Sequence, residues 1–256
     1  MTWLEAIILG IIQGFTEFLP ISSSGHLVLA QYIMDINERG VLVEIILHMG
    51  TLLAIIIYYS NDLKIMLKDL LNGKRETWTY IFYLGIATIP IACGGLLLDD
   101  LIELTFIPSV VIVMLAITGL VLFATFFFSN HPRKEFSPLI VFCIGIAQFF
   151  ALIPGISRSG ITISIAILMG IHHREAAKFS FFLAIPALLG ASLIQIIKMD
   201  HWQHITTFSF ILGFLSSAIS GFLVIDWLLA VISKGKFHLF SLYCFAISII
   251  TYFWIY

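Results

Sequence analysis

The stretch "PGISRSG", residues 154–160, places an arginine, two serines, a proline and two glycines inside a long run of apolar residues. The chain around it is 60% hydrophobic and 11% charged over 256 residues, and its 23 phenylalanines exceed what one soluble core of this size could bury. This composition predicts an all-α polytopic membrane protein. A charge at membrane depth costs at least a few kcal/mol, so Arg158 requires a stabilising partner. Membrane lipids are expected partners, and nucleic acid is not, because no basic run follows the pattern of a phosphate backbone.

Six apolar stretches are long enough for an α-helix to cross about 30 Å of hydrocarbon. They lie near 41–60, 78–98, 108–128, 179–197, 207–233 and 239–256. Two further segments, 3–34 and 139–171, are interrupted by "PISSSG" (20–25) and "PGISRSG". We interpret the first of these as part of the mature fold and not as a signal peptide, because no basic residue or cleavage site precedes it. Breaks at membrane depth require burial in protein or a wet cavity, so each interrupted segment is expected to form two helices around a polar tip.

Basic residues predict which loops face the cytoplasm, because lysine and arginine favour that side. Ten of the thirteen fall in four loops: Lys64, Lys68, Lys74 and Arg75; Arg133 and Lys134; Arg174 and Lys178; Lys234 and Lys236. The intervening loops, which include Glu38 with Arg39, residues 99–103, and Lys198 with Asp200, are then outside. Both loops that flank 139–171 lie inside, so this segment enters and leaves on one face. It is predicted to be a re-entrant hairpin with "PGISRSG" at its tip.

An internal repeat assigns the first interrupted segment in the same way. At a shift of 135 residues, eight of the sixteen positions from Gly10 to Gly25 match those from Gly145 to Gly160, including Gln13 with Gln148. Each half of the single domain, about 1–130 and 131–256, then consists of one re-entrant hairpin followed by three spans. The first hairpin enters from outside and the second from inside. This is an inverted-topology repeat, and its shared site is expected near the midplane where the two tips meet.

The two tips together have the properties of an anion site. The returning helices begin near 22–24 and 157–159, where serines can act as N-caps. A helix N-terminus presents free N–H groups and the positive end of its dipole, so two facing N-termini attract an anion. Arg158 adds a guanidinium fork suited to phosphate or carboxylate. An anionic ligand is therefore the expected partner of the arginine.

Polar residues on the first hairpin extend this chemistry. Gln13 and Glu17 are four residues apart and share one helical face, which suits a hard cation such as Mg²⁺ or Ca²⁺; alternatively, Glu17 only neutralises Arg158. One of the serines Ser22, Ser23 and Ser24, together with His26, is a candidate for nucleophile and base, and His26 is also a candidate to bond phosphate directly. The alternative is that the serines only cap the helix. His48, within a span, is expected to face the bundle without a direct role.

The segments "QGFTEFLPISSSGHL" (13–27) and "PGISRSGIT" (154–162) resemble the two signatures of the bacterial undecaprenyl-diphosphatase family associated with bacitracin resistance. The resemblance covers essentially the whole chain. It implies hydrolysis of undecaprenyl diphosphate, a polyprenyl diphosphate lipid, to undecaprenyl phosphate and inorganic phosphate, which recycles the lipid carrier of peptidoglycan synthesis. It also implies a divalent cation and a location in the plasma membrane, with an active site that opens to the outer face.

The resemblance also implies roles for individual residues. Gln13 and Glu17 match a cation-binding pair in which glutamate or glutamine comes first, and with glutamine at position 13 Glu17 carries more of that role. Ser23 matches the proposed nucleophile, His26 the motif histidine that assists it, and Arg158 the phosphate-binding arginine. The expected substrate-binding residues are Ser22, Ser24, Ser157, Arg158, Ser159, Gly160 and Thr162.

Two other functions share parts of this pattern. A transporter or flippase of polyprenyl phosphate lipids is the alternative, because inverted repeats with discontinuous helices are common in transporters. The type 2 phosphatidic acid phosphatases share the look of "SSGH" and "SRSG". That family places a histidine six residues after the arginine, where this chain has Ser164, so it is set aside.

Overall fold

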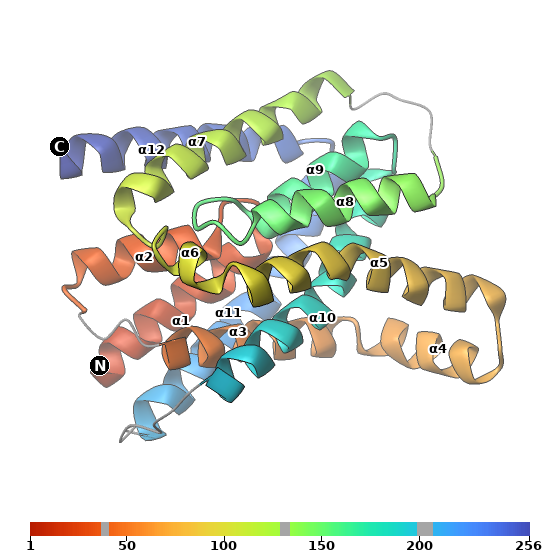
Figure 1. Ribbon diagram of the computed structural model, residues 1–256, viewed down its shortest axis with the longest axis horizontal. Coiled ribbons are helices and arrows are strands. Elements are labelled where there is room, and N and C mark those ends of the chain that lie inside the picture. The colour runs from red at the N-terminus through yellow and green to blue at the C-terminus, as the bar shows by residue number, and fades with distance from the viewer. Residues whose placement is uncertain (37–40, 129–133, 199–206) are drawn as a thin grey trace.

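The computed structural model describes residues 1–36, 41–128, 134–198 and 207–256, and the regular elements in these ranges are all helices (Figure 1). The predicted all-α fold class is confirmed. Four residues of the orientation argument, Glu38, Arg39, Arg133 and Asp200, lie outside the described residues.

Both interrupted segments form pairs of short helices, as predicted. The first pair is α1 (Trp3–Phe18) and α2 (Ser23–Ile33), and the second is α8 (Pro138–Phe150) and α9 (Arg158–Leu168). At 1.5 Å per residue, the 13 residues of α8 extend about 20 Å and the 11 residues of α9 about 16 Å. Neither reaches the roughly 30 Å needed to cross hydrocarbon, which is the behaviour expected of a re-entrant hairpin.

Longer helices follow each hairpin. Within the described ranges, five helices are long and apolar enough to cross a membrane, or six if α3 and α4, bent by 72° where they meet, form one span. The remaining elements are α3 (Val41–Tyr58), α4 (Ser60–Leu71), α5 (Arg75–Leu97), α6 (Asp99–Glu103), α7 (Pro108–Ala124), η1 (Thr125–Phe128), α10 (His173–Lys198), α11 (Thr207–Ser233), η2 (Phe237–Leu239) and α12 (Phe240–Ile255).

Two predicted loops are helical. Residues 60–71, expected to be part of a basic loop, form α4, which buries none of its residues and has Asp62 in its first turn and Lys68 in its last. These charges complement the helix dipole, and Leu63 and Met66 pack against the largest core cluster, so α4 forms a helix although it is rich in charged residues. Similarly, α10 begins at His173, so Arg174 and Lys178 belong to its first turns. The predictions were wrong here because they ended each helix where its apolar residues end, whereas backbone hydrogen bonding continues beyond that point.

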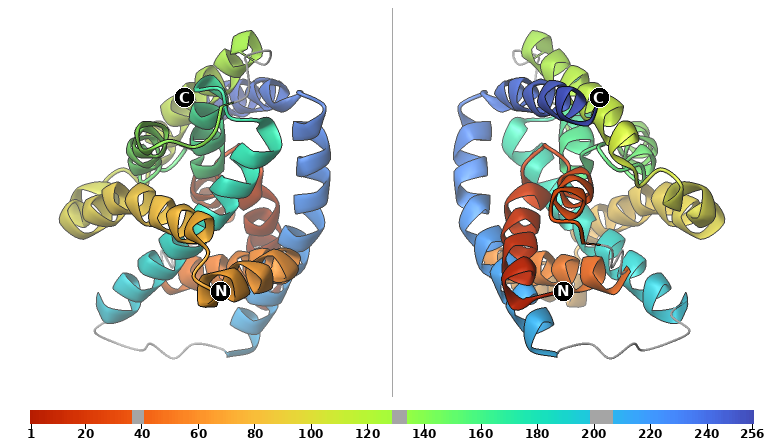
Figure 2. Two further views of the ribbon diagram at one scale, coloured as in Figure 1. Left: turned by 90° about the vertical axis from the view of Figure 1, so that its right-hand side faces the viewer. Right: turned by 90° about the vertical axis from the view of Figure 1, so that its left-hand side faces the viewer.

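Helix pairing is consistent with the predicted inverted repeat. The first hairpin helix α1 packs on α11, and its counterpart α8 packs on α5; likewise α3 contacts α11 and α10 contacts α5. The remaining large contacts, α7 with α12 and α3 with α10, join equivalent helices of the two halves. Figure 2 shows α5 and α11 on opposite flanks of the molecule with the first hairpin between them. The largest apolar core cluster includes residues of both hairpins, such as Phe18 and Ile163.

Small residues let α1 approach α11 closely. A Cβ atom added at Gly14 would lie 2.5 Å from the Ser217 carbonyl oxygen, and one at Gly10 would lie 2.5 Å from the Gly213 carbonyl oxygen. Glycines spaced by four residues, facing glycine and serine, are a common way for membrane helices to pack backbone against backbone. This contact holds the first hairpin, and with it the candidate site, against the second half of the chain.

Candidate active site where the two hairpin tips meet

The first tip is closed by Ser22, which caps α2. The Ser22 hydroxyl accepts a hydrogen bond from the Gly25 N–H at 3.3 Å. It also accepts one from the Gly155 N–H at 3.1 Å, which belongs to the second tip. Ser22 has a φ of 69°, a left-handed conformation that non-glycine residues adopt at a cost. One serine therefore caps a helix and joins the two hairpins.

The second tip repeats this arrangement. Ser157 caps α9 and accepts from the Gly160 N–H at 3.0 Å, as the repeat predicts from Ser22 and Gly25. Each cap hydroxyl also contacts the serine two residues later, at 3.3 Å for Ser24 and 3.2 Å for Ser159. Because the 135-residue shift relates all of these bonds, the serines act as N-caps in both halves, as expected.

The tips are in direct contact. The Ser159 hydroxyl donates to the Leu19 carbonyl oxygen of the first tip at 3.2 Å. A Cβ atom at Gly25 would lie 3.0 Å from Cα of Gly155, a distance that real Cβ atoms rarely show. Gly155 has a φ of 99°, which glycine adopts without strain. The N-termini of α2 and α9 are thus brought together, which supports the predicted anion-binding geometry.

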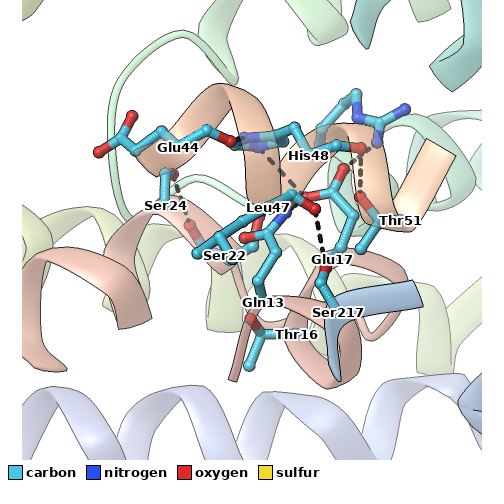
Figure 3. A network of polar contacts seen from close by, with 12 residues as sticks. Gln13, Thr16, Glu17, Ser22, Ser24, Glu44, Leu47, His48, Thr51 and Ser217 are labelled. Atoms are coloured by element: carbon cyan, nitrogen blue, oxygen red, sulfur yellow. Dashed lines mark hydrogen bonds and ion pairs between the residues drawn. The ribbon is translucent and has the colours of Figure 1, made fainter. Parts of the chain in front are cut away.

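Glu17 is the centre of the polar network between the tips (Figure 3). Its Oε1 pairs with the Arg158 guanidinium of the other hairpin. Its Oε2 accepts from Ser23 Oγ at 2.5 Å and from Gln13 Nε2 at 3.1 Å, and His48 Nε2 lies 3.7 Å from the same oxygen. The side chains of Glu17 and Arg158 are 5% and 14% exposed. This buried ion pair stabilises the charge of Arg158, and its hydrogen-bond donors hold the carboxylate in place.

His26 lies apart from this network. Its Nδ1 is 2.7 Å from the Ser22 carbonyl oxygen, and its Nε2 is 2.9 Å from the Tyr243 hydroxyl of α12. A carbonyl only accepts, so Nδ1 carries the hydrogen of the neutral ring and Nε2 accepts from the tyrosine. The structure gives Ser23 a hydrogen bond to Glu17, whereas the expected partner was His26. Ser23 and His26 are three residues apart on α2, but their side chains bond different helices: Ser23 bonds Glu17 of α1, and His26 bonds Tyr243 of α12.

Thr162, an expected substrate-binding residue, uses its hydroxyl for hydrogen bonds to other residues of the protein. Its hydroxyl donates to the Arg158 carbonyl oxygen at 2.7 Å and lies 2.7 Å from the Ser180 hydroxyl of α10. Thr162 is buried. Its position therefore supports the first turn of α9 and the packing of α10 behind it.

Comparison with known proteins identifies the family. Residues 6–250 match the model of a family described as "Bacitracin resistance protein BacA". The chain belongs to this BacA family. It is 37% identical over 254 residues to the undecaprenyl-diphosphatase of Caldicellulosiruptor bescii, covering 97% of this chain and 96% of that protein. Proteins with the same name from Bacteroides thetaiotaomicron (35% identical, 95% and 96% covered) and Korarchaeum cryptofilum (38% identical, 96% and 96% covered) are similarly related. The resemblance inferred from the two motifs is confirmed.

In this BacA-family protein, the predicted cation ligands show one unpaired group. Gln13 is fully buried, and its Oε1 has no hydrogen-bond partner within the described part of the chain. A buried polar atom without a partner costs about 1–3 kcal/mol, so such an atom beside a carboxylate suggests a ligand. Amide and carboxylate oxygens are what a hard cation prefers. The residues present therefore fit a divalent cation.

Sequence reasoning missed three residues of the BacA-family site. His48 of α3 faces Glu17 although it was expected to have no direct role. Tyr243 of α12 contacts His26, with the two rings stacked 5.7 Å apart. Thr118 of α7 holds the second tip, donating to the Gly155 carbonyl oxygen at 2.8 Å and accepting from the Ser157 N–H at 3.2 Å. The only local signal was the presence of a histidine and a threonine within apolar spans.

Proposed function

We propose that this protein is an integral membrane undecaprenyl-diphosphatase, which hydrolyses undecaprenyl diphosphate to undecaprenyl phosphate and inorganic phosphate. Relatives that carry this name match over nearly the full length of the chain. The observation that carries the proposal is the position of Arg158 and two helix N-termini at the meeting point of the hairpin tips. This activity recycles the lipid carrier for peptidoglycan synthesis, and it accounts for the bacitracin resistance in the family description.

The tips are suited to hold the diphosphate group. Arg158 offers a planar fork that matches phosphate oxygens, and the N-termini of α2 and α9 add N–H groups with the positive ends of two dipoles. The binding residues are Ser22, Ser24, Ser157, Arg158, Ser159 and Gly160, and Thr162 supports them from the next turn of α9. The polyprenyl tail would lie among lipids and apolar helix surfaces. The site would open to the outer face of the plasma membrane, as the resemblance to the family implies.

Ser23 is the proposed nucleophile and Glu17 its base. The Ser23 Oγ–H already points at Glu17 Oε2 at 2.5 Å. When a phosphate takes the Arg158 guanidinium, Glu17 Oε1 loses its partner and is free to accept a proton. Ser23 Oγ then forms a bond to the terminal phosphorus, its proton passes to Glu17, and the bond from phosphorus to the bridging oxygen breaks to release undecaprenyl phosphate. Water then attacks phosphorus, the bond from phosphorus to Ser23 Oγ breaks, Glu17 returns its proton to Oγ, and inorganic phosphate leaves.

His26 keeps a supporting role in this scheme. His26 lies about one turn after Ser22 on α2, and its Nε2 bonds the Tyr243 hydroxyl. Since Glu17 takes the serine proton, His26 is left to bond a phosphate oxygen or to orient the leaving group. Its pairing with Tyr243 links the first hairpin to the last helix of the chain.

A divalent cation, Mg²⁺ or Ca²⁺, is proposed at Glu17 and Gln13. The support is the unpartnered Gln13 Oε1 beside the Glu17 carboxylate. A cation bound there would neutralise charge on the phosphate oxygens.

The test is phosphate release from undecaprenyl diphosphate by the purified protein, with and without a chelator. Arg158→Ala, Glu17→Ala and Ser23→Ala should each lose nearly all turnover, whereas Ser233→Ala, which removes a hydroxyl at the C-terminal end of α11, should retain most of it. Near-normal turnover of the Arg158 and Glu17 variants would contradict the proposed diphosphatase activity at this site. A phosphoserine trapped by rapid quench should map to residue 23.

An assay of the same protein in liposomes distinguishes the flippase alternative from the hydrolase. The discontinuous helix pairs α1–α2 and α8–α9 are the observation that keeps this alternative in view. A flippase would move a fluorescent polyprenyl phosphate across the bilayer without releasing inorganic phosphate. Phosphate release without lipid movement supports the hydrolase.

A further inference from the structure

His48 directs its ring nitrogen Nε2 toward Glu17. Its Nδ1 lies 2.7 Å from the Glu44 carbonyl oxygen, which can only accept, so Nδ1 carries a hydrogen. In the neutral ring, Nε2 then has a lone pair and no hydrogen. Histidines that bind metals usually donate their other ring N–H to a backbone carbonyl or carboxylate, which fixes the tautomer in this way.

The distance from His48 to Glu17 fits two ligands of one ion. Nε2 and Oε2 are 3.7 Å apart, longer than a hydrogen bond. Two ligand atoms that each lie about 2.1 Å from a common ion are about 3.4 Å apart at a tetrahedral angle and about 4.2 Å apart when opposite. The observed distance falls between these limits. Arg158 occupies the other carboxylate oxygen, Oε1, and an ion at Oε2 would take the place of the hydrogen bonds from Ser23 and Gln13.

Gln13 supplies a third group. Its amide nitrogen lies 3.1 Å from the same Oε2, while its Oε1 is buried without a partner. Figure 3 shows these three side chains converging, with the Glu44 carboxylate pointing away. Within the described ranges, no three histidine, cysteine, aspartate or glutamate side chains gather at one point, so the site has one carboxylate, one imidazole and one amide.

The helix that carries His48 is held in place. The Ser217 hydroxyl of α11 donates to the Leu47 carbonyl oxygen at 2.7 Å, and the Thr51 hydroxyl donates to the His48 carbonyl oxygen at 2.9 Å. A Cβ atom at Gly50 would lie 2.5 Å from the Phe214 carbonyl oxygen, so α3 and α11 are in close backbone contact. The imidazole is therefore positioned by a rigid part of the fold, as a metal ligand requires.

From these contacts we infer that His48 Nε2 is a third ligand of the cation proposed at Glu17 and Gln13, and that it gives the site a preference for Mn²⁺ or Zn²⁺ over Ca²⁺. The inference rests on the cation of the proposed function and deepens it. Imidazole nitrogen binds first-row transition ions well, whereas Ca²⁺ takes oxygen ligands almost entirely. Three protein ligands leave the remaining positions to phosphate oxygens.

The test uses Mn²⁺ as the probe and pulsed electron paramagnetic resonance as the readout, on full-length protein without a histidine tag. Bound Mn²⁺ should show coupling to a ¹⁴N nucleus, and growth on ¹⁵N-histidine should convert that signal to the ¹⁵N pattern. This comparison needs no substitution, so a folding defect cannot produce it. His48→Gln should remove the coupling and weaken Mn²⁺ binding at least tenfold, with a smaller effect on Ca²⁺. The control His173→Gln, at the start of α10, should change neither.

Each other outcome has a defined meaning. Mn²⁺ that is lost in Glu17→Gln but shows no nitrogen coupling would overturn the role of His48 and leave the proposed cation. A wild-type protein that binds no Mn²⁺, alone or with inorganic diphosphate, overturns both. A protein that binds Mn²⁺ through His48 yet releases no phosphate from undecaprenyl diphosphate keeps this inference and loses the proposed function.

Discussion

Replacing Arg158 by methionine, with Glu17 left in place, should lower the free energy of unfolding by about 3–5 kcal/mol. The Glu17 side chain is 5% exposed, so without Arg158 its charge is buried with only hydrogen bonds to neutral groups. Glu17→Gln should have a similar effect, because it strands the arginine, which is 14% exposed. The double variant contains neither charge. The decrease in its free energy of unfolding should therefore be about 1–3 kcal/mol smaller than the sum of the decreases in the two single variants.

An exposed ion pair in the same protein is the matched control. Asp62 of α4 and Lys178 of α10 also pair, but their side chains are 41% and 43% exposed. Water screens such a pair, so the corresponding cycle with Asp62→Asn and Lys178→Met should give a coupling of about 0–1 kcal/mol. Unfolding can be followed in mixed micelles by the fluorescence of the five tryptophans. Additivity of the Glu17 and Arg158 variants within about 0.5 kcal/mol refutes the reasoning.

Three further substitutions test the packing around the site. Ser22→Ala removes both a helix cap and the bond to the second tip, so its unfolding free energy should fall by about 1–2 kcal/mol, more than for Ser137→Ala, which removes only the α8 cap. Gly14→Ala places a methyl group 2.5 Å from a carbonyl oxygen of α11 and should reduce the yield of monodisperse protein, whereas Gly190→Ala, which meets nothing within 4 Å, should not. Tyr243→Phe keeps the ring but loses the hydroxyl on His26, and phosphate release should fall by about fivefold, equivalent to one hydrogen bond of about 1 kcal/mol.

Each of these comparisons has an outcome that contradicts it. Equal losses for the two serine variants would mean that the Ser22 bond between the tips adds no stability. A well-folded Gly14→Ala protein would show that α1 and α11 separate easily. Unchanged turnover in Tyr243→Phe would remove the tyrosine from the site.

Features with local causes were predictable from the sequence. In "PISSSG" and "PGISRSG" proline, glycine and serine together interrupt the helix, so both hairpins and the caps at Ser22 and Ser157 follow from the motifs. Gln13 and Glu17 were expected on one helical face, and their hydrogen bond confirms it. Helix ends were less predictable, since α4 and the first turns of α10 are helical without being apolar.

Contacts between helices depended on the complete fold. From the sequence alone, His26 was the expected partner of Ser23, and only the packing of α1 against α2 directs Ser23 to the Glu17 carboxylate. Nothing in the sequence near His48 indicates which helix it faces, because that depends on how α3 rotates against α1 and α11.

The sequence by itself determined an all-α membrane protein with two polar hairpin tips, since composition, helix-breaking residues and the internal repeat act over a few turns of chain. The tertiary structure decided that Glu17 joins Arg158, Ser23, Gln13 and His48 at one point. These side chains come from three separate parts of the chain, and their distances are set by close packing at glycines that removes any freedom for the helices to slide or turn.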